Sequence, residues 1–433
     1  MKKTVKIFVL ILLAFSLALT AQEEKKDFSI QFSGFIKNDF FYDSRQTVNI
    51  REGHFLLYPA DFLPDADNRD INAEASLNFL SIQTRLTCAI TSPDAFGARV
   101  KGVIEADFFG NENAAFVDVN GFRLRHAYAQ LSWEKTQLLL GQYWHPLFIP
   151  GCFSEVISFN TGSPIQPFSR NPQIRVIHHP GKFHLIAAVS AQRDFTSAGG
   201  SNVLRNSALP EFQAQVQYEI KNTATRREFL AGFGGGVKWL RPLLNTEADG
   251  KKYVTDQTLS SYSFTAFAKM KCPAFTCKLQ GVYGTNLYDL LMIGGYGVST
   301  VTDPLRNTVA YTATRTLSVW SEGMTQGKTM QLGLWAGFTS NLGGAAPILY
   351  YSDRVGGTLG TVRGANIKSI LRISPRLVLI SGKFNFALET EYTSAAYAAK
   401  DEFGNLSRDS HGVIDLTQNL ANMRVLFATI LKF

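Results

Sequence analysis

Alternation between apolar and polar side chains, repeated along most of the chain, is the feature that most constrains the fold. Within residues 209–220 one face carries Phe212 and Val216 among its apolar side chains, and the other carries Gln213 and Gln217. Successive side chains of a β-strand point to opposite faces, so such a stretch forms a strand with one apolar and one polar face. The same alternation recurs in three further stretches, which are residues 28–39, 328–339 and 384–393.

Stretches of this kind predict about sixteen strands in the whole chain. They span residues 28–44, 73–91, 97–110, 120–133, 136–144, 173–179, 183–193, 209–221, 228–239, 258–270, 275–287, 308–321, 328–340, 365–380, 384–398 and 413–433. The connections between them alternate between short and long. A transmembrane barrel has antiparallel strands, with short turns at its periplasmic end and longer loops at the other. The pattern therefore predicts an all-β transmembrane antiparallel barrel with both chain ends on the periplasmic side.

A soluble β-sandwich or solenoid also has alternating strands, and composition argues against it. Its polar positions would be rich in Lys and Glu, whereas here they favour Ser, Thr, Gln and Gly, which suits a water-filled lumen. Charged residues make up only 18% of the chain, compared with about 25% in ordinary soluble proteins. After residue 21 no apolar stretch approaches the roughly 18 residues of a membrane-spanning helix.

The first 21 residues have the layout of a secretory signal peptide. A basic start precedes an apolar run over residues 7–19, and the small residue Ala21 ends the segment. We expect cleavage after Ala21, with Thr20 as the alternative, and a single barrel domain over residues 22–433. At the other end Phe433 closes an amphipathic strand, which resembles the signal read by the outer-membrane assembly machinery. These features predict the outer membrane of a Gram-negative bacterium.

Residues 145–172, between the fifth and sixth predicted strands, form an unusually apolar connection. They include five prolines and four phenylalanines. A loop bathed in water is not usually this apolar, and a barrel of about sixteen strands leaves room for a loop inside it. We therefore expect an infolded loop that sets the constriction of a channel. The alternative is a loop that packs on a neighbouring subunit.

Charged residues that face inward at mid-depth decide which ions pass through a narrow wet passage. The predicted constriction residues are Arg85, Arg125, Arg175, Arg372, Arg424, Glu105, Asp107, Glu155, Glu389 and Glu391. Bases outnumber acids once Arg123, Lys368 and Arg376 are added, which predicts a weak anion preference. The alternative is that these charges pair into neutral ladders that stabilise the wall.

The face on which Arg123 and Arg125 lie is ambiguous, because the same parity includes Ala127 and Leu131. A β-bulge between them would place the two arginines on the inner face and Ala127 and Leu131 on the outer face.

Signals for catalysis and for metal or cofactor binding are weak. No Gly-x-Ser-x-Gly, P-loop or His-Glu-x-x-His motif is present, and His179 and His184 flank a turn, where interface groups are more common than ligands. We therefore expect no enzyme, no cofactor and no metal site. Cys272 and Cys277 bracket a short turn and meet the requirement of a disulfide if their Cα atoms lie within about 7 Å. We expect the other two cysteines, Cys88 and Cys152, to stay unpaired.

Several motifs in the first half resemble porins of the DcaP-like type. They lie at residues 34–39, 43–46, 105–110, 123–128 and 139–144, within a resemblance that is strongest over about residues 30–180. The resemblance implies a sixteen-stranded, usually trimeric, outer-membrane diffusion channel, in some cases one that favours small anionic solutes such as dicarboxylates. The chain departs from this pattern in having only residues 22–27 before the first strand, in place of a long helical extension.

These observations together predict a porin for the passive diffusion of small hydrophilic solutes. Its expected partners are outer-membrane lipid, lipopolysaccharide, small hydrophilic or anionic solutes and two further copies of itself, and the mild net charge of +8 does not indicate nucleic acid. One alternative is a substrate-selective channel with an anion site at Arg85, Arg125 and Arg372. Another is a non-conducting barrel that acts as an adhesin or scaffold through its long loops, especially 45–72 and 341–364.

Overall fold

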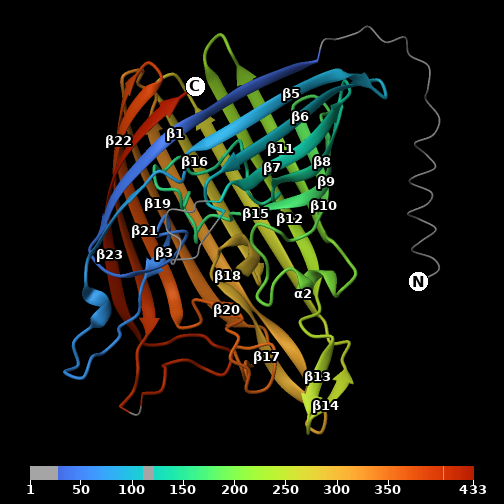
Figure 1. Ribbon diagram of the computed structural model, residues 1–433, viewed down its shortest axis with the longest axis vertical. Helices are drawn as coiled ribbons and strands as arrows, with labels where there is room; N and C mark the ends of the chain where they lie inside the picture. Colours follow the sequence, from blue (N-terminus) through green and yellow to red (C-terminus); the bar gives the residue numbers. More distant parts are fainter. Residues whose placement is uncertain (1–27, 111–120, 403) are drawn as a thin grey trace.

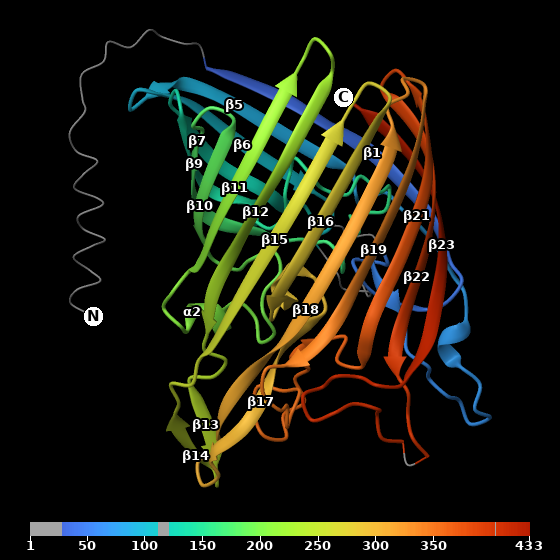
Figure 2. The same ribbon diagram turned by 180° about the vertical axis from the view of Figure 1, so that it is seen from behind.

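A computed structural model describes residues 28–110, 121–402 and 404–433, and its strands close into one barrel (Figures 1 and 2). The wall is a sheet of sixteen antiparallel strands. It closes because β1 pairs with β23 on one side and with β5 on the other. The predicted fold class is confirmed. The predicted signal peptide lies outside the described residues.

The wall strands correspond one to one with the predicted stretches. In the first half they are β1 (Ser29–Asp43), β5 (Arg85–Ala95), β6 (Ala98–Asp107), β7 (Arg123–Ser132), β8 (Thr136–Trp144), β9 (Arg170–His178), β10 (Phe183–Ser190) and β11 (Glu211–Asn222). In the second half they are β12 (Arg227–Leu240), β15 (Leu259–Lys271), β16 (Phe275–Thr285), β18 (Thr308–Thr325), β19 (Met330–Gly344), β21 (Ile367–Ser381), β22 (Phe384–Ala398) and β23 (Thr417–Lys432). The predicted strand 73–91 is divided, because a break at residues 81–84 separates β4 (Ser76–Leu80) from β5.

Short turns and long connections alternate around the barrel as the spacing predicted. The short turns lie at the end where β1 starts and β23 finishes (Figure 1). The long connections contain the smaller elements, which are β2 (Thr47–Ile50), β3 (Phe55–Pro59), η1 (Ile71–Ala73), α2 (Asn202–Arg205), β13 (Asn245–Ala248), β14 (Lys251–Val254), η3 (Tyr288–Leu290), β17 (Gly294–Asp303) and β20 (Val362–Arg363). The hairpin of β13 and β14 projects beyond the wall beside β17 (Figure 2). Among the described residues no helix has the length and apolar character needed to cross a membrane.

The two faces of the wall have opposite chemistry. On β11 the apolar Phe212 is exposed on the outside, whereas its neighbours Glu211 and Gln213 are buried inside. On β22 Phe386 is likewise exposed, and Glu389 is buried. A soluble protein places these residue types the other way round, so the exposed apolar surface is suited to lipid. The alternation along each strand therefore produces a membrane-facing exterior and a polar interior.

The disulfide that the spacing of Cys272 and Cys277 left possible is not formed. All four cysteines lie in the described residues and all are free. Cys277 is paired with Met270 across the strands, and the backbone N–H of Cys272 bonds to Phe275. The two cysteines are thus diagonal neighbours on one face, about 7–8 Å apart, beyond the reach of a disulfide.

Candidate functional site

The segment between β8 and β9, residues 145–169, contacts inward-facing carboxylates of distant strands. Glu389 of β22 accepts hydrogen bonds from the backbone N–H groups of Ile157 (2.7 Å) and Ser158 (3.0 Å). Glu322 of β18 accepts one from the N–H of Glu155 (3.0 Å). Both carboxylates are buried. In the order of the sheet, β18 and β22 lie across the barrel from β8 and β9, so these bonds join opposite parts of the wall.

Arg372 of β21 is the most connected of the predicted constriction residues. Its guanidinium donates hydrogen bonds to three backbone carbonyls, those of Ser163 (2.6 Å), Leu56 (2.9 Å) and Leu57 (2.9 Å). Its Nε donates to the Thr393 hydroxyl at 2.9 Å and lies 3.5 Å from the Glu391 carboxylate, an ion-pair distance. The other oxygen of Glu391 accepts a hydrogen bond from the Asn160 side chain at 2.8 Å. The Arg372 side chain is 0% exposed. It therefore fastens β3 and the 145–169 segment to the wall.

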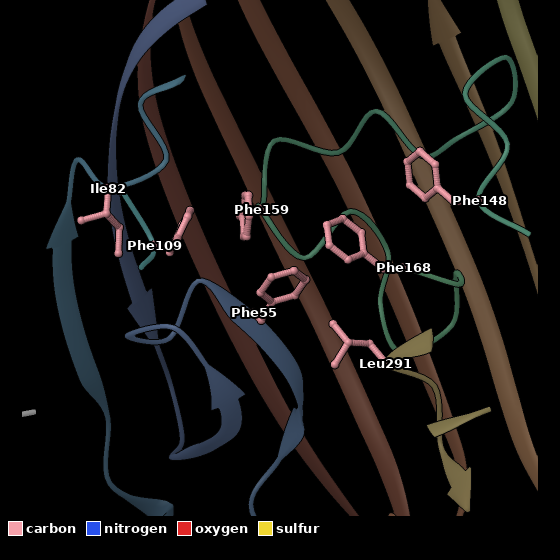
Figure 3. Packing of buried hydrophobic residues seen from close by; sticks show 7 residues of the cluster. All are labelled: Phe55, Ile82, Phe109, Phe148, Phe159, Phe168 and Leu291. Atoms are coloured by element: carbon pink, nitrogen blue, oxygen red, sulfur yellow. The ribbon is translucent and has the colours of Figure 1, made fainter. Parts of the chain in front are cut away.

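Aromatic side chains from several connections pack together inside the barrel (Figure 3). Phe159 of the 145–169 segment stacks on Phe109 with ring centroids 4.3 Å apart, and meets Phe55 of β3 edge-on at 4.7 Å. Phe168 also meets Phe55 edge-on. Such contacts contribute about 0.5–1.5 kcal/mol per pair beyond the burial of apolar area. The phenylalanines that made residues 145–172 unusual in the sequence thus bind this segment to other loops.

A network of paired charges lines the inner face of β5, β6 and β7. Glu105 lies 2.7 Å from Arg125 and 3.8 Å from Arg85. Asp107 lies 2.8 Å from Arg125 and 2.7 Å from Arg123. The pairing of β6 with β7 shifts by one residue at this point, so Arg125 has no partner opposite it. This is the predicted β-bulge. Because of it Arg123 and Arg125 face inward, whereas Ala127 lies opposite the outward Ile104.

The network continues through Asp194, which lies in the connection after β10. Its carboxylate lies 2.7 Å from Arg170 of β9, 3.6 Å from Arg51 and 3.7 Å from Arg123. Burial raises the pKa of Asp194, but Arg170 and Arg51 outweigh that effect and hold the pKa below its usual range. Asp194 is therefore ionised at neutral pH.

Five arginines and three carboxylates of the described residues make up this arginine network. Arg51 has a further interaction, and without it four arginines remain for three carboxylates. The members are Arg51, Arg85, Arg123, Arg125, Arg170, Glu105, Asp107 and Asp194.

The remaining predicted residues lie elsewhere on the inner wall. Arg424 makes a two-pronged pair with Asp43, at 2.9 and 2.7 Å. Arg175 is buried over the ring of Tyr143 and donates to the Trp144 carbonyl at 2.6 Å. These arginines are held by wall groups rather than exposed in an open ring.

A second cluster of charges contains Glu155, Arg376 and two residues that were not predicted, Lys278 and Glu322. Lys278 lies 2.7 Å from Glu155 and 3.0 Å from Glu322, and Arg376 lies 2.8 Å from Glu322. Glu322 was missed because the strand was predicted to end at residue 321, although the inward parity of Ser318 and Trp320 continues to it.

Sequence reasoning also missed Lys278, Asp194, Arg170 and Arg51. Lys278 lies on the polar face of a predicted strand, so alternation offered a signal for it. Asp194 and Arg51 lie in connections, where no periodicity indicates a direction.

Metal ligands do not gather anywhere in the described part of the chain: no group of three or more His, Cys, Asp or Glu side chains is placed to hold an ion. The Nδ1 atoms of His179 and His184 lie 2.9 Å apart, and His184 also contacts Glu219 at 3.3 Å. This pairing joins β11 to the turn between β9 and β10.

A closed sixteen-stranded barrel with an apolar exterior and a charged interior is the fold of the porin class. The chain is similar in structure to the outer-membrane channel DcaP of Acinetobacter baumannii, with a TM-score of 0.62 at 16% identity over 96% of this chain and 100% of that one. It is also similar to an anion-selective porin from Comamonas acidovorans (TM-score 0.52, 11% identity, 94% and 100% covered) and to OmpT, an outer membrane protein of Vibrio cholerae (0.52, 8%, 95% and 100%). No protein-family model and no curated protein sequence matches the chain. At these identities the likeness shows the fold, which is the one that the resemblance to DcaP-like porins implied.

Proposed function

We propose that the chain is a porin of the Gram-negative outer membrane, a water-filled channel for passive diffusion of small hydrophilic solutes with a weak preference for anions. The observation that carries the proposal is the arginine network on the inner face of a closed barrel. Fixed charge beside a narrow aqueous path attracts ions of opposite sign, and here arginines outnumber carboxylates even without Arg51. Following the resemblance to DcaP-like porins, we propose a homotrimer held in lipid and lipopolysaccharide.

The uneven burial of the inner wall supports a path beside the arginine network. Trp320 of β18 and Trp335 of β19 are fully buried and pack with Ile165. On the other side Arg85 is 21% exposed and Arg123 is 14% exposed. Water reaches the network but not the tryptophans, so solutes should pass along β5 to β9.

The 145–169 segment has a role of its own in this proposal. It is the infolded loop, and it narrows the passage from the side of β18 to β22. Its contacts with Glu322, Glu389 and Arg372 hold it in place without any contribution from solute. These contacts support a constriction that forms without solute, as a passive channel requires.

A substrate-selective channel for small anions is the second candidate, and the arginine network is the observation that favours it. Several adjacent guanidinium groups can bind a carboxylate with paired hydrogen bonds, whereas a general channel needs only their field. Block of the ionic current by a solute separates the two, because a bound solute interrupts conductance and a merely permeating one does not.

Planar-bilayer recordings of the folded protein across a salt gradient test the proposal. We expect discrete conductance steps and a reversal potential displaced toward that of the anion. Absence of steps from correctly folded protein would contradict a channel, and a reversal potential displaced toward the cation would contradict the anion preference.

The Arg85→Gln variant should move the reversal potential toward that of the cation. Among the network arginines that lie on wall strands, Arg85 has the most exposed side chain. The nearest carboxylate, that of Glu105, is 3.8 Å away. Substituting Arg85 therefore removes one positive charge at little cost in folding free energy. The matched control is Lys251→Gln on the projecting hairpin, which makes the same change of charge away from the wall. Equal reversal potentials for the two variants would remove Arg85 from the ion path.

A further inference from the structure

A groove on the outside of the barrel crosses three strands at the end with the short turns. Ile220 of β11, Phe229 of β12 and Met270 of β15 are paired in register, so their side chains form one row on the outer face. All three are exposed, as is the neighbouring Phe275 of β16. The groove has a volume of about 630 Å³.

Cationic side chains border this row at the rim. Arg227 lies two residues from Phe229 on the same outer face, and Arg226 precedes it in the turn. Lys271 also borders the groove, but it pairs in register with Glu228 and follows the outward Met270, so it belongs to the inner face. Both arginines are exposed, and neither has an ion-pair partner within the part of the chain that the structure describes. The groove thus has positive charge at its rim and apolar surface below.

The carboxylates nearby do not neutralise this charge. Glu228 borders the groove. Because it follows the outward Arg227 in the strand, its side chain points to the inner face, where its carboxylate lies 2.8 Å from the Lys269 ammonium. Glu219 also lies on the inner face, paired with Lys221. Each of these acids already has its own lysine, so the described carboxylates leave the positive charge of Arg226 and Arg227 in place.

We propose that the groove binds an anionic phospholipid of the leaflet that faces the periplasm. Its phosphate would lie against Arg226 and Arg227, and an acyl chain along Ile220, Phe229 and Met270. Guanidinium groups bind phosphate strongly, and basic residues at a membrane surface attract anionic headgroups. A soluble phosphate would leave the apolar row uncovered, which is why the structure favours a lipid. The inference rests on the proposed function only for the orientation of the barrel in the membrane.

Native mass spectrometry of the folded protein in detergent tests the proposal, with phosphatidylglycerol as the probe. Wild-type protein should retain the lipid, and Arg226→Gln/Arg227→Gln should retain at least roughly tenfold less, since each cation near an anionic surface contributes a factor of about five. The matched control is Lys383→Gln, in the exposed turn between β21 and β22. It should bind like the wild type.

Two competitors identify the lipid chemistry. Phosphatidylcholine has a phosphate but no net charge and should bind more weakly, and glycerol 3-phosphate has no acyl chains and should not displace the lipid. Equal retention of both lipids, equal loss in the control variant, or displacement by glycerol 3-phosphate would overturn the proposal.

The double variant changes no residue of the arginine network, so its conductance should be normal. A silent channel that still binds lipid would count against the proposed function alone.

Discussion

Deleting residues 150–167 and joining the ends with a short glycine-serine linker should raise single-channel conductance roughly twofold or more, because an emptied barrel of this width leaves an aqueous channel. The segment supplies Ile165, which covers Trp320 and Trp335, and its backbone occupies the carboxylates of Glu322 and Glu389. Without it the inner faces of β18 to β22 meet water. Planar-bilayer recordings of the folded variant measure the change.

A deletion outside the barrel is the matched control for this experiment. Removing residues 245–254 takes away the projecting hairpin of β13 and β14 and should leave conductance unchanged. Far-UV circular dichroism and the resistance of the folded barrel to detergent on gels report whether each variant has folded. A folded 150–167 deletion with the conductance of the wild type would show that the segment does not set the constriction.

The Arg372→Ala variant should be the most destabilised single substitution in the inner wall. The change leaves the Glu391 carboxylate without its arginine and the carbonyls of Ser163, Leu56 and Leu57 without a donor, all in a buried region. Removing one partner of a buried ion pair costs about 3–5 kcal/mol in folding free energy. Urea unfolding in detergent micelles, followed by tryptophan fluorescence, measures the loss.

Comparison with Arg85→Ala separates the effect of losing a buried, hydrogen-bonded arginine from the effect of losing one positive charge. Arg85 is partly exposed, and its ion pair with Glu105 is long, at 3.8 Å. The Arg85→Ala substitution should therefore lower the free energy of unfolding by less than about 1 kcal/mol. Arg372→Lys keeps the charge but cannot reach three carbonyls at once, and its stability should lie between those of the wild type and Arg372→Ala. Equal unfolding midpoints for Arg372→Ala and Arg85→Ala would contradict the anchoring role.

The wall of the barrel was predictable from the sequence because the direction of a side chain in a strand depends on local parity alone. The predicted strands at 136–144 and 384–398 coincide with β8 and β22 residue for residue. The inward direction of Glu389 and Arg372 followed from the same rule, and so did the need for a bulge near Arg125.

What those inward side chains contact was decided only by the tertiary structure. Arg372 has the pattern of a constriction residue, yet it lies beneath β3 and the 145–169 segment, which come from distant parts of the chain. Asp194 and Arg51 lie in connections, where no parity rule applies, so their place in the arginine network had no signal in the sequence. Periodicity specifies which way a side chain points, whereas burial and pairing depend on which loop the closed barrel places over it.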